Sequence, residues 1–312
     1  MKRIAQYIKK FIEYRRSLKF KHQPKLAMAM CVRNEADIIA MNIRFHSAYG
    51  VDKFYVMDNY SDDGTYEILK DLSEGFDISL FRERSYSQAK YMTFLTNRAH
   101  EDGCDWVIEN DADEFWRPLK GDLKMELDFN KSVIKCHRYN VVPTQDSMLS
   151  GHPVFYSKYR TNTPILYDWK VGYSLDKDIN YILADVGDKV MVNTHGFIDV
   201  KFGNHRAKHI ASKWPNRKPD VISDGVIVYH FMIRGYDQFK KRLVAMNENF
   251  ISGQMKSKQG QAWYWNSAYE LGETELVYKK MVLNESQISS FVDGGFVIED
   301  LFISEIFENY NR

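Results

Sequence analysis

The sequence predicts an α/β fold: a mainly parallel, Rossmann-like sheet flanked by helices, with a helical C-terminal region. Between residues 25 and 110, short apolar runs alternate with segments that carry apolar residues at helical spacing. Such a βαβαβαβ order is typical of a parallel sheet with helices on both faces. From residue 236 to the C-terminus the pattern is mostly helical. A chain of 312 residues is long enough for one large α/β domain or two modest ones.

The N-terminal half gives the clearest order of elements. The first strand is the apolar run at 25–32. A helix follows it, with its pattern at 38–46 and Gly50 as the residue that stops it. Further strands are predicted at 53–57, 78–81 and 105–110, with helices at 66–72 and 87–100. Beyond residue 130 the pattern weakens, and strands are predicted at 132–137, 189–193 and 225–231. The intervening stretch 143–185 is rich in turn residues and is predicted to be a long loop or insertion.

Residues 1–22 predict a basic amphipathic helix. Ile4, Ile8, Phe11 and Ile12 lie at helical spacing, among eight lysines and arginines and a single acid, Glu13. Two interpretations stay open. The helix is a membrane-surface anchor that faces anionic lipid, or it packs on the protein body or forms a partly disordered tail. The amphipathic pattern of the helix alone does not distinguish these two interpretations.

Composition excludes several classes of protein. The net charge of +1 gives no overall field that selects nucleic acid. Three cysteines without a C-x-x-C pattern argue against a disulfide framework or zinc site and favour a reducing compartment. No apolar run approaches 18 residues, and no apolar core follows the basic N-terminus as in a signal peptide. We therefore expect a cytoplasmic protein, peripheral at the inner face of the plasma membrane if residues 1–22 are an anchor.

The stretch 105–116 (DWVIENDADEFW) is the most informative motif. An apolar run that reads as a buried strand ends in a cluster of carboxylates, where ligands bind in open α/β sheets. Asp111 and Asp113 lie two apart, so on an extended segment both side chains face the same way. Their oxygens suit a hard cation such as Mg²⁺ or Mn²⁺. A second D-x-D, at 176–178, has no strand before it and is predicted to be a solvated loop.

Two further polar loops end strands of the same predicted sheet. Arg33-Asn34-Glu35 follows the first strand, and the stretch 58–65 (DNYSDDGT) follows the second. Carboxyl ends of parallel strands open on one edge, so these loops and the acidic motif are predicted to converge. Each also has a structural interpretation: 58–65 is good turn and helix-cap chemistry. Glu35 suits a first helical turn, and Glu114 is an N-terminal charge or supports the metal ligands.

In this order, C-x-R-N-E-A, D-N-x-S-x-D-G-T and D-A-D-E-F resemble glycosyltransferase family 2, closest to the bacterial branch with a D-x-D-E-F motif. The resemblance covers residues 25–120 and, more thinly, 200–245. It implies a GT-A domain at 24–235, with a nucleotide-binding half at 24–120 and an acceptor half at 121–235, between the helix of residues 1–23 and a helical extension at 236–312. A nucleotide-diphosphate sugar would lie over the strand ends.

The resemblance also implies roles for individual residues. Those that would bind the nucleotide-sugar are Arg33, Asn34, Glu35, Asp58, Asn59, Ser61 and Asp111. Asp113 would hold the divalent metal, Mn²⁺ or Mg²⁺, on the diphosphate, with Asp111 also on the ion but nearer the ribose. A bound metal offsets the negative charge of the leaving diphosphate, and a base must deprotonate the acceptor hydroxyl. On the helix at 87–100, Gln88 and Arg98 are predicted to be solvated, with the donor pocket as the alternative.

Two histidines resemble the same branch. His230 ends the strand GVIVYHF and is predicted to be a third metal ligand, with a satisfied core histidine as the alternative. Arg234, just after it, could reach the diphosphate with its forked donors. His205, in Gly-Asn-His-Arg, is a candidate base, a substrate contact or a loop residue. The E-D pair that usually supplies the family's base is missing near 200–210. The loop acids Asp146, Asp168 and Asp224 are therefore further candidates.

The predicted function is that of a metal-dependent hexosyltransferase. It would move a sugar from a nucleotide-diphosphate sugar to a glycan or lipid-linked acceptor in bacterial surface polysaccharide synthesis, and the resemblance favours inversion. A catalytically degenerate scaffold that binds sugar nucleotide or glycan is the alternative. A nucleotidylyltransferase ranks lower, because residues 33–37 lack the glycines that hold a triphosphate. The stretch 263–265 (WYW) is a candidate acceptor or dimer surface, with core packing as the alternative.

Overall fold

The computed structural model describes residues 2–85, 87–149, 157–167, 180–213, 220–253, 255 and 260–310. The chain divides into two compact units. The first unit comprises residues 1–138 and 187–228, and the second comprises 139–186 and 229–312. The chain therefore crosses between units three times. These boundaries do not coincide with the predicted ones at 23/24 and 235/236, and the domain assignment stays a prediction.

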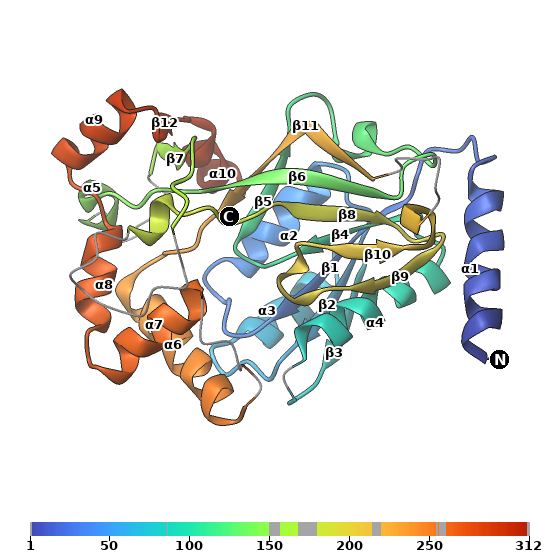
Figure 1. The fold of residues 1–312 in the computed structure, drawn as a ribbon, viewed down its shortest axis with the longest axis horizontal. Coiled ribbons are helices and arrows are strands. Elements are labelled where there is room, and N and C mark those ends of the chain that lie inside the picture. Colours follow the sequence, from blue (N-terminus) through green and yellow to red (C-terminus); the bar gives the residue numbers. More distant parts are fainter. Residues whose placement is uncertain are drawn as a thin grey trace. The chain divides into compact units, whose positions relative to one another are not determined.

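The first unit is built on an eight-stranded sheet in the order β3-β2-β1-β4-β8-β6-β11-β5. Its first four strands are parallel neighbours: β1 (Leu26–Val32), β2 (Lys53–Asp58), β3 (Ile78–Arg82) and β4 (Trp106–Asn110). They are connected through α2 (Ile39–Ala48), α3 (Thr65–Leu72) and α4 (Gln88–Glu101) (Figure 1). The α/β class and the predicted order of strands and helices over this half are confirmed.

The rest of the sheet mixes directions. β8 (Lys189–Asn193) is antiparallel to β4, and β6 (Val133–Asn140) is antiparallel to β8. Two further strands complete it, β11 (Asp220–His230) and β5 (Glu114–Pro118). β5 begins within the acidic motif, and β11 begins five residues before the predicted strand. Asp224 therefore lies in a strand, and its predicted position in a loop is wrong.

Burial explains why this half of the chain folds as it does. All residues of β1 except Cys31 are buried, as expected of a strand covered on both faces. Helix α4 packs against β1 and β2, and Tyr91, Met92, Leu95 and Ala99 form its buried face. The smaller elements of the first unit are α1 (Lys2–Ser17), β9 (Phe197–Val200), β10 (Ala207–His209), and the short helices η1 (Leu123–Glu126), η3 (Phe202–Asn204) and η4 (Ile210–Lys213).

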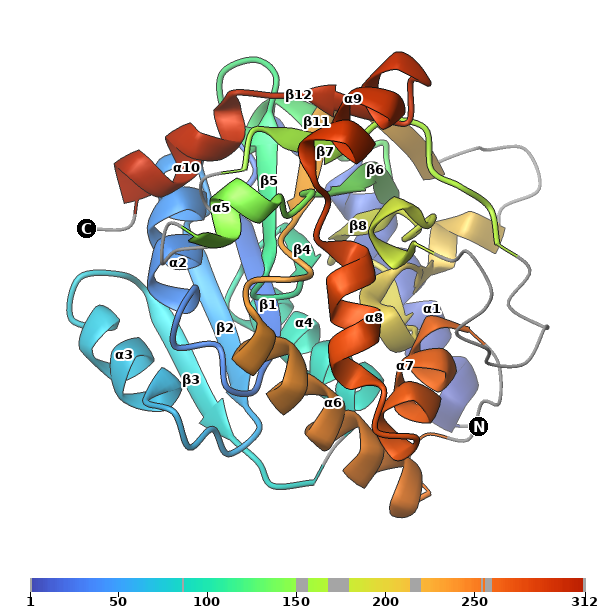
Figure 2. The same ribbon diagram turned by 90° about the vertical axis from the view of Figure 1, so that its left-hand side faces the viewer.

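The second unit is mainly helical, as predicted for the C-terminal region (Figure 2). Its helices are α6 (Tyr236–Ile251), α7 (Gln261–Glu270), α8 (Thr274–Met281), α9 (Glu285–Asp293) and α10 (Phe302–Tyr310). The predicted loop at 143–185 contributes α5 (Gln145–Leu149), β7 (Tyr159–Thr161) and η2 (Tyr181–Leu183), and β7 pairs with β12 (Val297–Glu299). The predicted loop at 176–178 lies outside the described residues.

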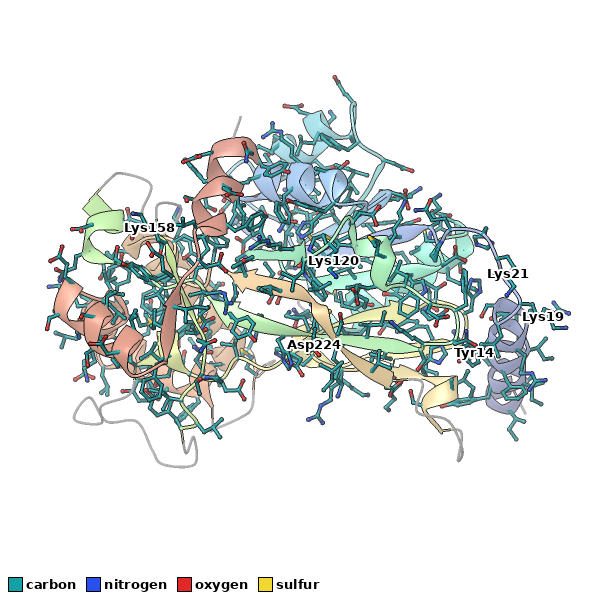
Figure 3. All side chains as sticks on the ribbon, turned by 90° about the horizontal axis from the view of Figure 1, so that it is seen from above. Tyr14, Lys19, Lys21, Lys120, Lys158 and Asp224 are labelled. Atoms are coloured by element: carbon teal, nitrogen blue, oxygen red, sulfur yellow. The ribbon has the colours of Figure 1, made fainter. Side chains whose placement is uncertain are left out.

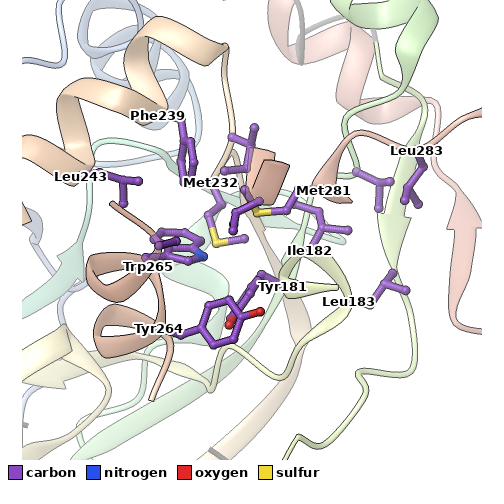
Figure 4. Close-up of a cluster of buried hydrophobic side chains, with 14 of the residues drawn as sticks. Tyr181, Ile182, Leu183, Met232, Phe239, Leu243, Tyr264, Trp265, Met281 and Leu283 are labelled. Carbon is purple, nitrogen blue, oxygen red and sulfur yellow. The ribbon is translucent and has the colours of Figure 1, made fainter. Parts of the chain in front are cut away.

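The core of the second unit gathers side chains from η2 and the C-terminal helices (Figure 4). Trp265 packs edge-on against Phe239 with ring centroids 5.2 Å apart, and Tyr264 lies 4.6 Å from Tyr181. Tyr264 and Trp265 are 4% and 2% exposed. The interpretation of these two residues as an acceptor or dimer surface is therefore wrong, because their rings fill the core of this unit.

The cysteines Cys31, Cys104 and Cys136 are all free thiols. Among the described residues, no helix combines the length and the apolar character needed to cross a bilayer.

Candidate functional site

The loops that follow β1 and β2 are joined by hydrogen bonds, as their predicted convergence requires. The backbone N–H of Asn34 donates to the Ser61 hydroxyl (3.0 Å), and its side-chain oxygen accepts from the N–H of Asp62 (3.0 Å). The N–H of Glu35 donates to the Thr65 hydroxyl (2.8 Å). Asn34 has φ +59°, a left-handed conformation that asparagine tolerates better than most residues. Arg33, just before it, is exposed.

Asp58 and Asn59 anchor this region from within. The Asp58 carboxylate is fully buried, accepts from the N–H of Ser61 and lies 2.9 Å from Nε of Arg82. The Asn59 amide donates to three successive carbonyls, those of residues 83–85. Both side chains therefore hold backbone in place, as the turn-and-cap interpretation expects. Their role in binding a nucleotide stays a prediction.

The acidic motif is surrounded by partners from distant parts of the chain. One Asp111 oxygen lies 2.6 Å from the Lys189 ammonium. The other accepts from the side-chain amides of Asn204 (3.0 Å) and Gln88 (3.3 Å). Lys189 is the first residue of β8 and is fully buried, and it also lies 3.2 Å from a Glu114 oxygen. The Asp111 carboxylate is thus held by three side chains while remaining 28% exposed.

Glu114 lies among charged partners. It is fully buried, and its second oxygen lies 2.6 Å from the Arg138 guanidinium. Burial raises the pKa of Glu114, while Lys189 and Arg138 oppose that rise. Asp113, the residue before it, is 5% exposed. The motif thus gathers carboxylate oxygens at the end of β4, and such an oxygen-rich cluster suits a hard cation.

Asn204 contains an acceptor without a partner. Its side chain is buried, its Nδ2 donates to Asp111, and its Oδ1 has no hydrogen-bond partner among the described residues. A buried, unpaired amide oxygen is costly unless a ligand or water satisfies it. It belongs to the same side chain that holds Asp111, so the missing donor or cation would bind beside the acidic motif.

His205 is held as a neutral imidazole. Its Nδ1 lies 2.8 Å from the Asp188 carbonyl oxygen, so Nδ1–H donates there and Nε2 keeps its lone pair. Burial, helped by the positive charges of Arg138 and Lys189, lowers the pKa of His205 to about 4. A side chain on Gly203 would lie 2.7 Å from the imidazole, and Gly203 has φ +81°. Glycine is therefore required for the ring to pack here.

The other predicted site residues are spread over both units. Asp224 is exposed on β11 in the first unit, and Asp146 is exposed on α5 in the second. His230 and Arg234 are buried in the second unit, and Nδ1 of His230 bonds the side chain of Asn140 (2.8 Å). Their assignment as metal and diphosphate ligands stays a prediction. Asp168 lies outside the described residues.

Sequence reasoning missed Lys189 and Arg138 and misjudged Gln88. Gln88 contacts Asp111, so its placement on a solvated face is wrong. Arg98, 42% exposed and paired with Glu101, is solvated as predicted. One signal was available for Lys189: a lysine comes directly before the three apolar residues of the strand KVMVN, where an unpaired charge would be costly.

No protein-family model matches the chain. A rice protein (Oryza sativa subsp. japonica) described as a glycosyltransferase family 92 protein is 35% identical over 105 residues, which is 30% of this chain and 17% of the relative. The chain therefore spans less than a fifth of that relative. The match concerns a glycosyltransferase but does not confirm membership of family 2.

Several solved structures share parts of the fold at low identity. S. aureus TarS 1–349 in complex with UDP-GlcNAc is 14% identical, with 92% of this chain and 91% of that chain covered and a TM-score of 0.37. Glucosyl-3-phosphoglycerate synthase from Mycobacterium tuberculosis, in complex with Mn²⁺ and UDP-glucose, is 17% identical, with 37% and 44% covered and a TM-score of 0.26. At these values nothing about ligands passes from those proteins to this chain.

Proposed function

We propose that this protein is a glycosyltransferase that takes its sugar from a nucleotide-diphosphate sugar with the help of a divalent metal. The observation that carries the proposal is the Asp111 cluster at the carboxyl end of β4. There, clustered carboxylate oxygens and the unpaired Asn204 oxygen suit a cationic partner. The resemblance of the three strand-end motifs to family 2 and the local likeness to the rice glycosyltransferase support the same function.

The residues present fit a hard cation. Carboxylate oxygens of Asp111 and Asp113 would hold Mn²⁺ or Mg²⁺, with Glu114 and its partner Arg138 keeping the motif in place. When bound, the ion would offset the charge of the leaving diphosphate as a Lewis acid. His230 as a third ligand rests on the sequence resemblance and is part of the proposal on that ground.

Lys189 would contribute a permanent positive charge. Its ammonium neutralises part of the charge on Asp111 and Glu114, so a diphosphate approaching this edge meets less repulsion. Because Lys189 is held by both carboxylates, the charge is already oriented before the substrate arrives, the condition under which electrostatic stabilisation is most effective. Nucleotide contacts by Arg33, Glu35 and Asp58, and diphosphate contact by Arg234, belong to the same proposal.

His205 is the favoured base. The neutral ring carries a lone pair on Nε2 and could accept the acceptor hydroxyl's proton as the new glycosidic bond forms and the bond to the diphosphate breaks. The products would be a glycoside and a nucleoside diphosphate, with inversion at the sugar carbon. Asp146 and Asp224 are the alternative bases. A glycan or lipid-linked acceptor, a role in surface polysaccharide synthesis, and a cytoplasmic location complete the proposal.

One observation favours a scaffold that binds sugar nucleotide without catalysis. Asp111 already has an internal cation, Lys189, at 2.6 Å, and Asp58 has Arg82 at 2.9 Å. A cluster partly neutralised from within has less need of a metal. The two functions differ in the release of free nucleotide, which only the enzyme would catalyse.

The test combines binding with turnover. Melting temperatures would be measured with nucleoside diphosphates and their sugar conjugates, with and without Mn²⁺, for wild type, Asp113→Ala and the control Asp71→Ala, which changes an exposed residue of α3. A ligand that binds only the folded state raises the melting temperature by mass action. We expect a metal-dependent shift in wild type and in Asp71→Ala and none in Asp113→Ala, together with nucleotide release from the matching sugar conjugate.

Other outcomes decide against parts of the proposal. A shift that is equal in Asp113→Ala, or that does not depend on metal, would overturn the metal site. A metal-dependent shift without nucleotide release, with glycan and lipid-linked acceptors supplied, would favour the scaffold.

A further inference from the structure

Helix α1 packs on the first unit through the face opposite to its apolar stripe. Tyr14 is fully buried; its hydroxyl donates to the Asn130 carbonyl (3.3 Å), and its ring meets His209 edge-on at 5.0 Å. Ser17, three residues on, is also fully buried. Figure 3 shows Tyr14 on the helix, with Lys19 and Lys21 in the segment that follows it. The C-terminal half of α1 is therefore fastened by polar and aromatic contacts.

The apolar stripe, defined as Ile4, Ile8, Phe11 and Ile12, faces solvent. These side chains are 66%, 55%, 40% and 43% exposed. Ser17 lies nine residues beyond Ile8, a rotation equivalent to about 180° at 3.6 residues per turn, so packing through Ser17 and Tyr14 leaves the stripe facing outward. Tyr7 is a further exposed apolar residue of α1, and outside this helix no described element carries more than two of the exposed large apolar residues. A four-residue apolar stripe left in water indicates an interaction surface.

The charge on and after α1 is mostly positive. Lys9, Arg15, Arg16, Lys19 and Lys21 are exposed, whereas the helix carries one acid, Glu13. Glu13 is already engaged, 3.7 Å from Lys9 and 3.8 Å from His100. An exposed apolar stripe bordered by exposed basic residues is complementary to an anionic lipid surface, where each base near the surface contributes about 1 kcal/mol.

The first turns of α1 pack less closely on the first unit than its last turns. A hollow of about 400 Å³ separates this half of the helix from β9 and β10, and its lining residues are Gln6, Tyr7, Lys10, Ile198, Asp199 and Lys208. The N-terminal half is thus less closely packed than the half that carries Tyr14. An interfacial helix needs to place its apolar face only about 5–10 Å into the boundary between headgroups and acyl chains.

We propose that α1 docks the protein on an anionic membrane surface, with the apolar stripe in the interface and the basic residues on acidic headgroups. The helix does not need to leave the body to do so, because its packing face and its docking face are different. The inference is independent of the proposed function, since vesicle binding requires neither a sugar nucleotide nor a metal.

The test is co-sedimentation with vesicles made of equal parts phosphatidylglycerol and phosphatidylcholine, beside vesicles of phosphatidylcholine alone. The variants are Ile8→Glu/Phe11→Glu in the stripe, Arg15→Glu/Arg16→Glu in the basic border, and the control Ile251→Glu, at a 79% exposed residue of α6. We expect wild type and the control to bind the anionic vesicles, less at high salt. Both double variants should need at least about tenfold more lipid for half binding. All melting temperatures should agree, since the substituted side chains are exposed.

Two results would overturn the proposal. One is that wild type fails to sediment with anionic vesicles, or that the stripe variant sediments as well as wild type. The other is that wild type is a dimer by light scattering, that Ile8→Glu/Phe11→Glu makes it a monomer, and that neither binds vesicles. The stripe would then be a contact between two copies of the chain.

Discussion

Replacing Lys189 with methionine tests whether the acidic motif depends on a buried internal cation. Lys189 is fully buried between Asp111, at 2.6 Å, and Glu114, at 3.2 Å. Methionine keeps most of the side-chain volume and removes the charge. The two carboxylates then lose a shared cationic partner, and water does not replace it because the position of Lys189 is fully buried.

The size of the expected loss of stability depends on the hydrogen-bond and ion-pair partners that each carboxylate retains in Lys189→Met. Removing one partner of a buried ion pair typically costs about 3–5 kcal/mol, because the other charge stays buried. Glu114 keeps Arg138 at 2.6 Å, and Asp111 keeps its bonds from Asn204 and Gln88 and is 28% exposed. These partners place the expected loss at the lower end, about 3 kcal/mol of the free energy of unfolding.

The assay is denaturant unfolding, with Lys201→Met as the matched control. Lys201 is 49% exposed and pairs with Asp199 at 3.1 Å, so its loss should leave the free energy of unfolding nearly unchanged. Because burial raises the pKa of Glu114, acidification protonates this carboxyl first, and the deficit of Lys189→Met should shrink at low pH. Mn²⁺ should also stabilise Lys189→Met more than wild type. The reasoning is refuted if Lys189→Met loses no more stability than Lys201→Met.

Three further predictions concern other buried groups. Burial raises the pKa of Glu109 to about 8, so between about pH 4.5 and 8 the folded carboxyl is protonated while the unfolded one is ionised. As pH rises from about 4.5 to 7, wild type should therefore lose about 3 kcal/mol of its free energy of unfolding relative to Glu109→Gln. Stability curves of the two proteins that stay parallel over this pH range would contradict the prediction. The shift of His205 has the opposite direction, because burial lowers its pKa to about 4. The unfolded state binds the extra proton below about pH 6.5, so acid should destabilise wild type more than His205→Gln, by about 3 kcal/mol near pH 4, measured by denaturant titration at each pH. Phe239→Ala empties part of the second unit's core, where Phe239 is fully buried against Trp265, and should cost about 3–5 kcal/mol; a loss below about 1 kcal/mol in the same assay would show that this core is loosely packed.

Much of the fold was legible in the sequence because its signals are local. The run Leu26–Val32 is apolar throughout since its strand is covered on both faces, and the turn chemistry of 58–65 marks the end of the next strand. Asp111 was found as a candidate because it follows a buried strand within a D-x-D pair and two further polar loops end strands of the same predicted sheet. The antiparallel half of the sheet was harder to predict, since strand direction there depends on pairings such as Trp106 with Asn193.

The sequence by itself determined the periodicities: most of the segments that are strands or helices, an amphipathic helix near the N-terminus, which spans Lys2–Ser17, and the acids that follow a buried strand. Only the tertiary structure decided which distant residues contact one another. It brings Lys189 to Asp111, 78 residues away in the chain, and sets the Asn204 amide beside the same carboxylate. It also turns the apolar stripe of α1 to solvent, because Tyr14 supplies the packing face instead. Periodicity gives each element an apolar side, but which side is covered depends on surfaces that exist only once the chain has folded.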